Sequence, residues 1–225
     1  MTECKIFFGF SGIFYQNTPG TVDHVTVRNE DLVCGNGIFV EGGSSDPSVT
    51  IQNNSVHDFD GVGIAVEAPS SGLKATIKNN YVRDTSSGLA SFGIWLDCCA
   101  STLVTGNVVV GSYGIGGINT DFNGVGSVAG NTIILGGIVA NGPAAVTSNN
   151  ILDSPIGVWV GNPSNSVKSN TITNSNVGIE FFCVANPNVS SNVINDAGVG
   201  VHDVPAGLAT PKNSYSNVLT IRTTC

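Results

Sequence analysis

Four carboxylates recur at one position of a short repeated phrase, four residues after a glycine that is followed by Ile. They are Glu41, Glu67, Asp97 and Asp121. Carboxyl pairs about 5 Å apart serve retaining glycoside hydrolases, and pairs up to about 9.5 Å apart serve inverting ones. Carboxylate oxygens are also ligands of Ca²⁺. We therefore predict Glu67, Asp97 and Asp121 as catalytic candidates, and Glu41, Glu67 and Asp97 as candidate Ca²⁺ ligands.

Aromatic and amide side chains occupy nearby positions of the same phrase. Both tryptophans of the chain lie two residues after such a glycine. Aromatic rings offer flat apolar surfaces that suit the faces of sugar rings, and amides can hydrogen-bond hydroxyl groups. The predicted substrate-binding residues, for a polysaccharide substrate, are Phe39, Trp95, Asn119, Asn141 and Trp159. By the same count from Gly198, His202 is expected to end the column of acids.

These side chains belong to an internal repeat. Its Gly-apolar phrase starts at residues 12, 37, 63, 93, 117, 137, 157, 178 and 198, so the spacing varies between 20 and 30 residues. Such variation suits short strands joined by turns of different length. Within each strand, alternate residues point to opposite faces, so the second and fourth residues after the glycine are expected to face outward.

A second phrase of the repeat contains asparagine between two apolar residues. Its asparagines are at positions 54, 80, 107, 131, 149, 170 and 192, and we expect Glu30 in that place of the preceding coil. Asparagine tolerates left-handed backbone geometry, and stacked amides can hydrogen-bond in a ladder. We interpret these asparagines as scaffold at a bend. Asp58, Asp84, Asp153 and Asp196, four residues further on, are expected to cap turns.

One coil of this size cannot bury its own apolar face, so successive coils must stack about 4.8 Å apart. The sequence therefore predicts an all-β, right-handed parallel β-helix, a solenoid of about 8–9 three-strand coils. Residues 1–225 are expected to form one domain, either a whole protein or a fragment of a longer chain. We find no amphipathic segment that would cap the ends.

The Asn and Gly-Ile repeats resemble those of the pectate-lyase-like superfamily of right-handed parallel β-helix proteins. That superfamily includes polysaccharide lyases, glycoside hydrolases, uronate epimerases, phage tailspikes and adhesins, so the resemblance implies the fold more than an activity. Asn119-Thr120-Asp121 matches one motif of polygalacturonase-like hydrolases, and the Asp-Asp and His-Gly motifs that accompany it are absent.

A lyase of the resembling kind needs an Arg or Lys base, and neither outward column contains one. Arg28, Lys78 and Lys168 are expected in the strand before the Asn bend, on another face. Arg83, beside Asp84 and one coil from His57, is the nearest alternative base, although we interpret it as part of a solvated ion pair.

The overall composition excludes some partners. A formal net charge of -8 repels nucleic acids and anionic membrane surfaces, so neither is expected as a partner. The first residues do not have the charged start and apolar stretch of a signal peptide, yet the resemblance implies an extracellular or cell-surface protein. The six cysteines show no metal-ligand spacing, and we expect buried free thiols.

Two functions remain open on this evidence. The first is an extracellular β-helix that binds, or cleaves as a hydrolase or lyase, a polysaccharide along the Gly-apolar strands, with Ca²⁺ as the one candidate cofactor. The alternative is a non-catalytic structural or adhesive solenoid that self-associates through its open ends.

Overall fold

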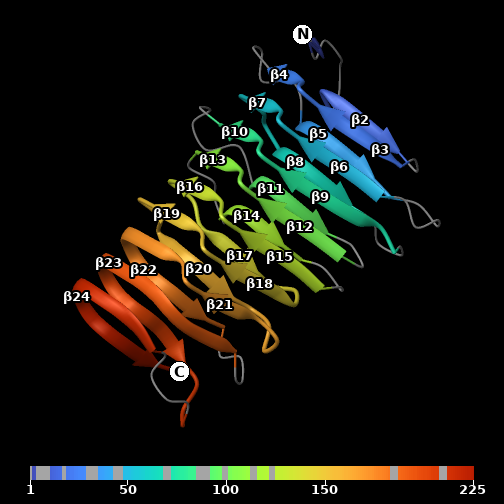
Figure 1. Ribbon diagram of the computed structural model, residues 1–225. Helices are drawn as coiled ribbons and strands as arrows, with labels where there is room; N and C mark the ends of the chain where they lie inside the picture. The colour runs from blue at the N-terminus through green and yellow to red at the C-terminus, as the bar shows by residue number, and fades with distance from the viewer. Residues whose placement is uncertain are drawn as a thin grey trace.

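The computed structural model describes residues 2–3, 11–16, 19–28, 35–42, 48–67, 72–84, 92–97, 101–111, 116–121, 125–182, 187–207 and 212–225. In this part of the chain the regular structure consists of 24 strands. No helix there is long and apolar enough to cross a membrane. Every strand pairing is parallel, and the strands wind into an elongated solenoid with the two termini at opposite ends (Figure 1). The predicted parallel β-helix is therefore confirmed.

Three stacks of short strands form the faces of the solenoid. The glycine sheet contains β2 (Ile13–Gln16), β5 (Asn36–Glu41), β8 (Val62–Glu67), β11 (Phe92–Asp97), β14 (Gly116–Thr120), β17 (Ile138–Ala140) and β20 (Ile156–Val160). The second sheet contains β3 (Gly20–Asp23), β6 (Ser48–Gln52), β9 (Lys74–Lys78), β12 (Ser101–Thr105), β15 (Val125–Ala129), β18 (Ala144–Thr147) and β21 (Ser166–Lys168). The third sheet contains β1 (Thr2–Glu3), β4 (Thr26–Arg28), β7 (Ser55–His57), β10 (Tyr81–Arg83), β13 (Val108–Val110), β16 (Thr132–Ile134) and β19 (Asn150–Leu152).

About seven turns are thus built from separate short strands. Beyond them the chain continues through the bends as three long strands, β22 (Thr171–Phe181), β23 (Asn188–Val204) and β24 (Lys212–Thr224). These strands pair with the last short strands and then with one another, so the same stacks are prolonged. The stacking agrees with the solenoid expected from the repeat.

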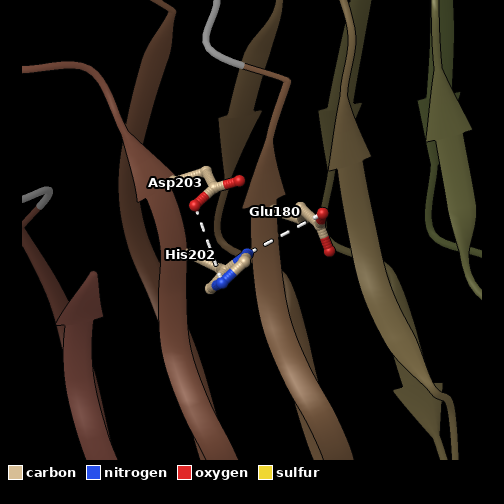
Figure 2. A group of neighbouring side chains, drawn as sticks. All are labelled: Glu180, His202 and Asp203. Atoms are coloured by element: carbon tan, nitrogen blue, oxygen red, sulfur yellow. Dashed lines mark ion pairs between the residues drawn. The ribbon is translucent and has the colours of Figure 1, made fainter. Parts of the chain in front are cut away.

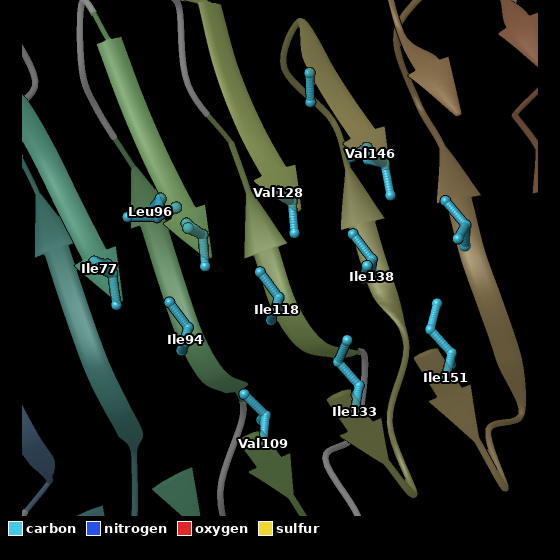
Figure 3. Packing of buried hydrophobic residues seen from close by; sticks show 14 of the residues in the cluster. Ile77, Ile94, Leu96, Val109, Ile118, Val128, Ile133, Ile138, Val146 and Ile151 are labelled. Atoms are coloured by element: carbon cyan, nitrogen blue, oxygen red, sulfur yellow. The ribbon is translucent and has the colours of Figure 1, made fainter. Parts of the chain in front are cut away.

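Identical apolar positions of successive coils pack on one another inside the solenoid (Figure 3). The glycine sheet stacks Ile94, Ile118 and Ile138, while the third sheet stacks Val109, Ile133 and Ile151. All six side chains are buried. Because each coil buries its apolar side chains against its neighbours, the core is continuous along the axis.

Glycine begins the glycine-sheet phrase because the next coil lies too close for a side chain. A Cβ atom on Gly37 would lie 2.6 Å from the carbonyl oxygen of Gly63, and one on Gly63 would lie 2.6 Å from that of Gly93. Real Cβ atoms do not approach backbone oxygen so closely, so a larger residue would push the coils apart.

The predicted asparagine ladder runs through the bend between the second and third sheets. Each side-chain oxygen accepts hydrogen bonds from the backbone N–H and the side-chain amide of the preceding asparagine, as in Asn107 to Asn131 at 2.9 Å for both bonds. Each side-chain amide also donates to a backbone carbonyl in the second sheet of the preceding coil, as Asn149 does to Val128 at 2.9 Å. The seven asparagines are buried, and the ladder continues to Asn213.

The left-handed residues of the bend differ from those expected. The residue before each ladder asparagine has positive φ, as at Asn53, Asn79 and Ser148, and the ladder asparagines themselves do not. The left-handed residue turns the chain, which frees the following asparagine to point inward and hydrogen-bond. The expected turn role is confirmed for Asp58, Asp153 and Asp196, each with positive φ, whereas Asp84 has no positive φ.

The first described coil corrects our alignment of the repeat. Val25, and not Glu30, occupies the ladder place, because its N–H donates to the Asn54 oxygen at 2.9 Å and its carbonyl accepts from Ser55. Val27 accordingly pairs with Val56, and Arg28 pairs with His57. Arg28 therefore lies in β4, after the bend, and the prediction that placed it before the bend is wrong. Lys78 and Lys168 do lie before it, in β9 and β21.

The expectation of free thiols also fails at the C-terminus. Cys225 forms a disulfide bond, and its partner lies outside the described residues. The positions of Cys4, Cys34, Cys98, Cys99 and Cys183 are outside them as well. The Cys225 N–H donates to Val204, so the disulfide holds the end of the last coil where the backbone still follows the stack.

The ladder predicts unequal effects at two adjacent asparagines. Asn149 serves four groups: its oxygen accepts from Asn131 twice, and its amide donates to Val128 and Asn170. We expect Asn149→Ala to lower the free energy of unfolding by about 3 kcal/mol or more, because each buried group left unpaired costs about 1–3 kcal/mol. Denaturant titration followed by circular dichroism measures this change.

The matched control is the exposed neighbour Asn150. Asn150→Ala should change the free energy of unfolding by less than about 0.5 kcal/mol, as is usual for surface substitutions. Equal losses in the two variants would contradict a structural role for the ladder.

Candidate functional site

The glycine sheet brings the four predicted carboxylates into one outward column. Glu41 pairs with Glu67, and Glu67 pairs with Asp97, in direct register on consecutive coils. Asp121 follows at the next coil, where its N–H donates to Leu96 at 2.8 Å. Glu41 and Glu67 are half-buried, whereas Asp97 and Asp121 are exposed. We call Glu41, Glu67, Asp97 and Asp121 the acid column.

Glu67 has the most perturbed environment of the acid column. Burial raises the pKa of the Glu67 carboxyl, and the negative charges of Asp97 and Glu41 on either side raise it further. At the start of the column, Glu41 accepts a hydrogen bond from the Gln16 amide at 2.8 Å. A carboxyl whose pKa is raised, next to further carboxyl groups, is an arrangement that general acid–base catalysis uses.

A second outward column, the aromatic column, lies two residues before the acid column on each strand. The register stacks its members in the order Phe39, Ala65, Trp95, Asn119, Val139 and Trp159. Phe39, Trp95 and Trp159 are half-buried, and the smaller members between them are buried. The second position therefore faces outward as expected, but Ala65, Asn119 and Val139 are buried because larger side chains flank them in the column.

Further aromatic rings extend this surface. The Phe14 ring lies 5.5 Å from Phe39, Phe92 stacks at 6.3 Å from Trp95, and Phe182 lies 6.0 Å from Trp159, all between ring centroids. Phe14 and Phe182 are 52% and 68% exposed. The aromatic surface thus runs over many coils parallel to the solenoid axis.

The five predicted substrate-binding residues differ in accessibility. Phe39, Trp95 and Trp159 present part of a ring, and Asn141 is exposed at the coil after Asp121. Asn119 is only 5% exposed, and its side-chain oxygen has no hydrogen-bond partner among the described residues. The indole N–H of Trp159 likewise has none there. The role of these five residues in binding stays a prediction.

His202 does not end the acid column. Gly178 stacks on Gly200 and not on Gly198, so Glu180 pairs with His202 and both continue the aromatic column. The prediction counted from Gly198 is therefore wrong by two residues. The shift places His202 between two carboxylates that the sequence did not bring together (Figure 2).

The resulting cluster consists of Glu180, His202 and Asp203. His202 Nδ1 lies 3.7 Å from Glu180 Oε1, and His202 Nε2 lies 3.6 Å from Asp203 Oδ1. The two carboxylates therefore face opposite ring nitrogens, as Figure 2 shows. This geometry suits ion pairing of a protonated imidazole, because one metal ion would use one ring nitrogen and draw both acids to the same side.

These three residues are the one group in the described part of the chain whose potential metal-ligating atoms lie within 4.8 Å of one another. The carboxylates of Glu41, Glu67 and Asp97 do not form such a group. Side-chain rotation would have to bring their oxygens together around an ion, since Ca²⁺ ligands lie about 2.3–2.6 Å from the metal. Ca²⁺ binding by these three residues stays a prediction.

Comparison with known families identifies the chain's class. A family model described as "Right handed beta helix region" matches residues 1–133, which is more than half of the chain. The chain therefore belongs to the right-handed β-helix family. Comparisons with curated proteins and with solved structures gave no match. Family membership agrees with the stacked coils, but it does not specify which reaction, if any, the protein catalyses.

The raised pKa of Glu67 predicts a pH-dependent stability effect. In the folded protein Glu67 binds its proton more tightly than in the unfolded chain, so its ionisation destabilises the fold as pH rises through its pKa. We expect Glu67→Gln to raise the melting temperature at pH 7. The gain should vanish below about pH 4, where Glu67 is protonated in both the folded and the unfolded protein. Thermal melts from pH 3 to 8 measure this.

Asp60→Asn is the control, because Asp60 is a partly buried carboxylate outside the acid column. It should not reproduce the pH-dependent gain. A Glu67→Gln variant that is less stable than the parent protein at pH 7 would contradict the repulsive environment assigned to Glu67.

Proposed function

We propose that the protein is an extracellular β-helix that binds a polysaccharide along the glycine sheet and cleaves it by hydrolysis. The observation that carries this proposal is the in-register acid column with Glu67 at its centre, beside the aromatic column. A glycan parallel to the solenoid axis would contact rings and carboxylates over several coils. Exposed aromatic faces and convergent polar groups are common in carbohydrate and other ligand sites.

The acid column supports a division of roles in hydrolysis. Glu67, whose pKa is raised, is the proposed proton donor to the glycosidic oxygen, and Asp97 or Asp121 is the proposed base or nucleophile. Members one coil apart stand about 4.8 Å apart in the backbone, and members two coils apart about 9.6 Å. The first separation suits retention of anomeric configuration and the second suits inversion. Ca²⁺ held by Glu41, Glu67 and Asp97 would instead favour binding of an acidic glycan.

A second candidate function is a structural or adhesive solenoid that self-associates end to end. Leu219 is 88% exposed and Ile221 is 50% exposed on β24. β24 pairs with β23, and no other described strand pairs with β24. Free strand edges and exposed apolar side chains favour stacking on a further chain.

The hydrolysis proposal predicts specific losses of binding and turnover. On a panel of polyuronates and neutral glycans, Glu67→Gln should lower turnover by about 100-fold or more, as loss of a general acid usually does. Reducing ends without unsaturated products would support hydrolysis, and unsaturated products would instead mean elimination. Trp95→Ala should weaken glycan binding by up to about tenfold, because one aromatic contact contributes about 0.5–1.5 kcal/mol.

Leu103→Ala is the control for Trp95→Ala. Leu103 is 41% exposed on β12 of the second sheet, so its loss removes apolar surface from a different face. Affinity should stay unchanged in this variant. If no glycan on the panel binds or is cleaved, with or without Ca²⁺, the carbohydrate proposal fails.

The self-association candidate has its own prediction. Sedimentation velocity at rising protein concentration should show assembly that Leu219→Ser with Ile221→Ser reduces, because these changes make the exposed strand more polar. Leu135→Ser, at a 45% exposed residue away from β24, is the control and should not affect assembly. A strictly monomeric profile at high concentration would remove this candidate.

A further inference from the structure

A register shift near the end of the chain creates the cluster of Glu180, His202 and Asp203. Val201 and Val204 are both completely buried, and the two residues between them are partly exposed side by side. Asp203 has a φ of 51°, in the left-handed region, and the pairing of β23 with β24 shifts register at the same place. Such shifts re-aim side chains and are frequent next to functional sites. Two consecutive residues of one strand thereby offer ligand atoms on one face.

The spacing of these ligand atoms is unusual for hydrogen bonds. His202 Nδ1 lies 3.7 Å from Glu180 Oε1, and His202 Nε2 lies 3.6 Å from Asp203 Oδ1 (Figure 2). Both separations exceed the hydrogen-bonding distance of about 3.2 Å. They are close to the separation of two ligands of one ion, because tetrahedral Zn²⁺ with bonds of about 2.0–2.2 Å places its ligands about 3.4 Å apart.

One ring nitrogen of the cluster has no hydrogen-bond partner. His202 Nδ1 is a buried atom, and the described residues provide no hydrogen bond to it. A buried polar atom of this kind is commonly explained by a bound water or ion. A proton on Nδ1 would leave its N–H without an acceptor at hydrogen-bonding distance in that part of the chain. A metal ion between Nδ1 and the carboxylate oxygen of Glu180 would satisfy both atoms.

We propose that Glu180, His202 and Asp203 bind one divalent transition-metal ion of the Zn²⁺ class. An imidazole nitrogen together with carboxylate oxygens suits Zn²⁺ and its neighbours, whereas Ca²⁺ and Mg²⁺ take oxygen ligands. One ligand atom from each of the three residues already lies within 4.8 Å of the other two. Three protein ligands leave one position of a four-coordinate ion for water.

One carboxylate has to turn before all three ligands reach the ion. A metal ion uses a single ring nitrogen, and the two carboxylates face opposite nitrogens. The side chains of Glu180 and Asp203 are 23% and 37% exposed, so either carboxylate can turn without disturbing the core. The ion-paired arrangement is then the metal-free state of the same site, in which a proton occupies the place of the metal on the imidazole.

The ion joins the last coils of the solenoid. Glu180 belongs to β22, and the other two ligands belong to β23. The Asp203 N–H also donates to Thr223 Oγ1 of β24 at 3.0 Å, so the site is connected to the final strand. Metal binding therefore stabilises this end of the fold, because only the folded chain presents all three ligands together. The inference does not depend on the proposed function.

Isothermal titration calorimetry with ZnCl₂, on protein first treated with EDTA, tests the inference. At neutral pH the parent protein should bind one Zn²⁺ per chain. His202→Gln, Glu180→Gln and Asp203→Asn should each weaken binding at least tenfold, since loss of a partner behind a metal ligand alone costs about 10–100-fold. Asparagine tolerates the left-handed conformation at position 203, and melting curves without metal show whether the variants remain folded. Absence of Zn²⁺ binding to the parent protein, or parent affinity in any of the three variants, would overturn the three-ligand site.

The matched control is His24, which pairs with a single aspartate. His24 Nδ1 lies 2.7 Å from Asp23 Oδ1, and the His24 side chain is 76% exposed. His24→Gln removes an imidazole beside a carboxylate at another place in the fold and should keep the parent Zn²⁺ affinity. Binding that is lost in His24→Gln and kept in His202→Gln would place the metal at the wrong histidine and overturn the inference.

Thermal melts and competition with Ca²⁺ test the site and the class of metal. Excess Zn²⁺ should raise the melting temperature of the parent protein by several degrees and leave that of His202→Gln unchanged. Equal rises in the two proteins would mean that the ion binds elsewhere. Ca²⁺ at the same concentration should not displace Zn²⁺ from the parent protein, because Ca²⁺ prefers oxygen ligands. Displacement would overturn the assignment to a transition metal.

Discussion

Hydrogen bonding of each coil to the coils before and after it is the constraint on which the structure depends. Parallel pairing at one-coil separation places identical positions of the repeat on top of each other. The apolar positions then form one continuous core, and the buried asparagines form a ladder whose donors and acceptors are satisfied by the next coil. A buried amide with fewer partners would be costly, so the ladder itself restricts the register.

The sequence was informative wherever the repeat kept its marker residues. From Gly37 to Gly178 each glycine of the repeat marks the equivalent position of its coil. The predicted acid and aromatic columns therefore coincide with the observed register. The reason is physical: glycine is required where the next coil's carbonyl oxygen lies too close for a Cβ atom. Asparagine is similarly required where one side chain must accept from a buried backbone N–H and donate to a buried backbone carbonyl.

Prediction failed where a coil lacked its marker residue or contained two candidates for it. Val25 replaces asparagine at the start of the ladder, so Glu30 was assigned there and Arg28 was moved to the wrong side of the bend. Near the C-terminus Gly200, and not Gly198, stacks on Gly178, which moves His202 next to Glu180. The second error is a shift of two residues, which the strand pattern alone leaves open because it preserves the alternation of inward and outward side chains. The first is a shift of five residues, from position 30 to position 25, in a coil that has no asparagine to mark the bend. The burial of a side chain by its neighbours in a column, as at Asn119, could not be predicted either, because it depends on which residues the stacked coils place beside it.

Stacking in register has an electrostatic consequence for charged residues that recur at one position of the repeat. Like charges on adjacent coils, about 4.8 Å apart, repel by roughly 0.9 kcal/mol in bulk water and about 3.5 kcal/mol at an effective dielectric near 20. A solenoid cannot stagger such residues along the axis, so it must accept the repulsion, shift a pKa or bind a counter-charge. In the acid column, burial and then the charges of Asp97 and Glu41 raise the pKa of Glu67. On the third sheet, burial and then the two arginines on neighbouring coils lower the pKa of His57 against the effect of Asp58. A bound cation would relieve the repulsion within the acid column, and therefore that column would bind most tightly the group that lowers its own electrostatic cost.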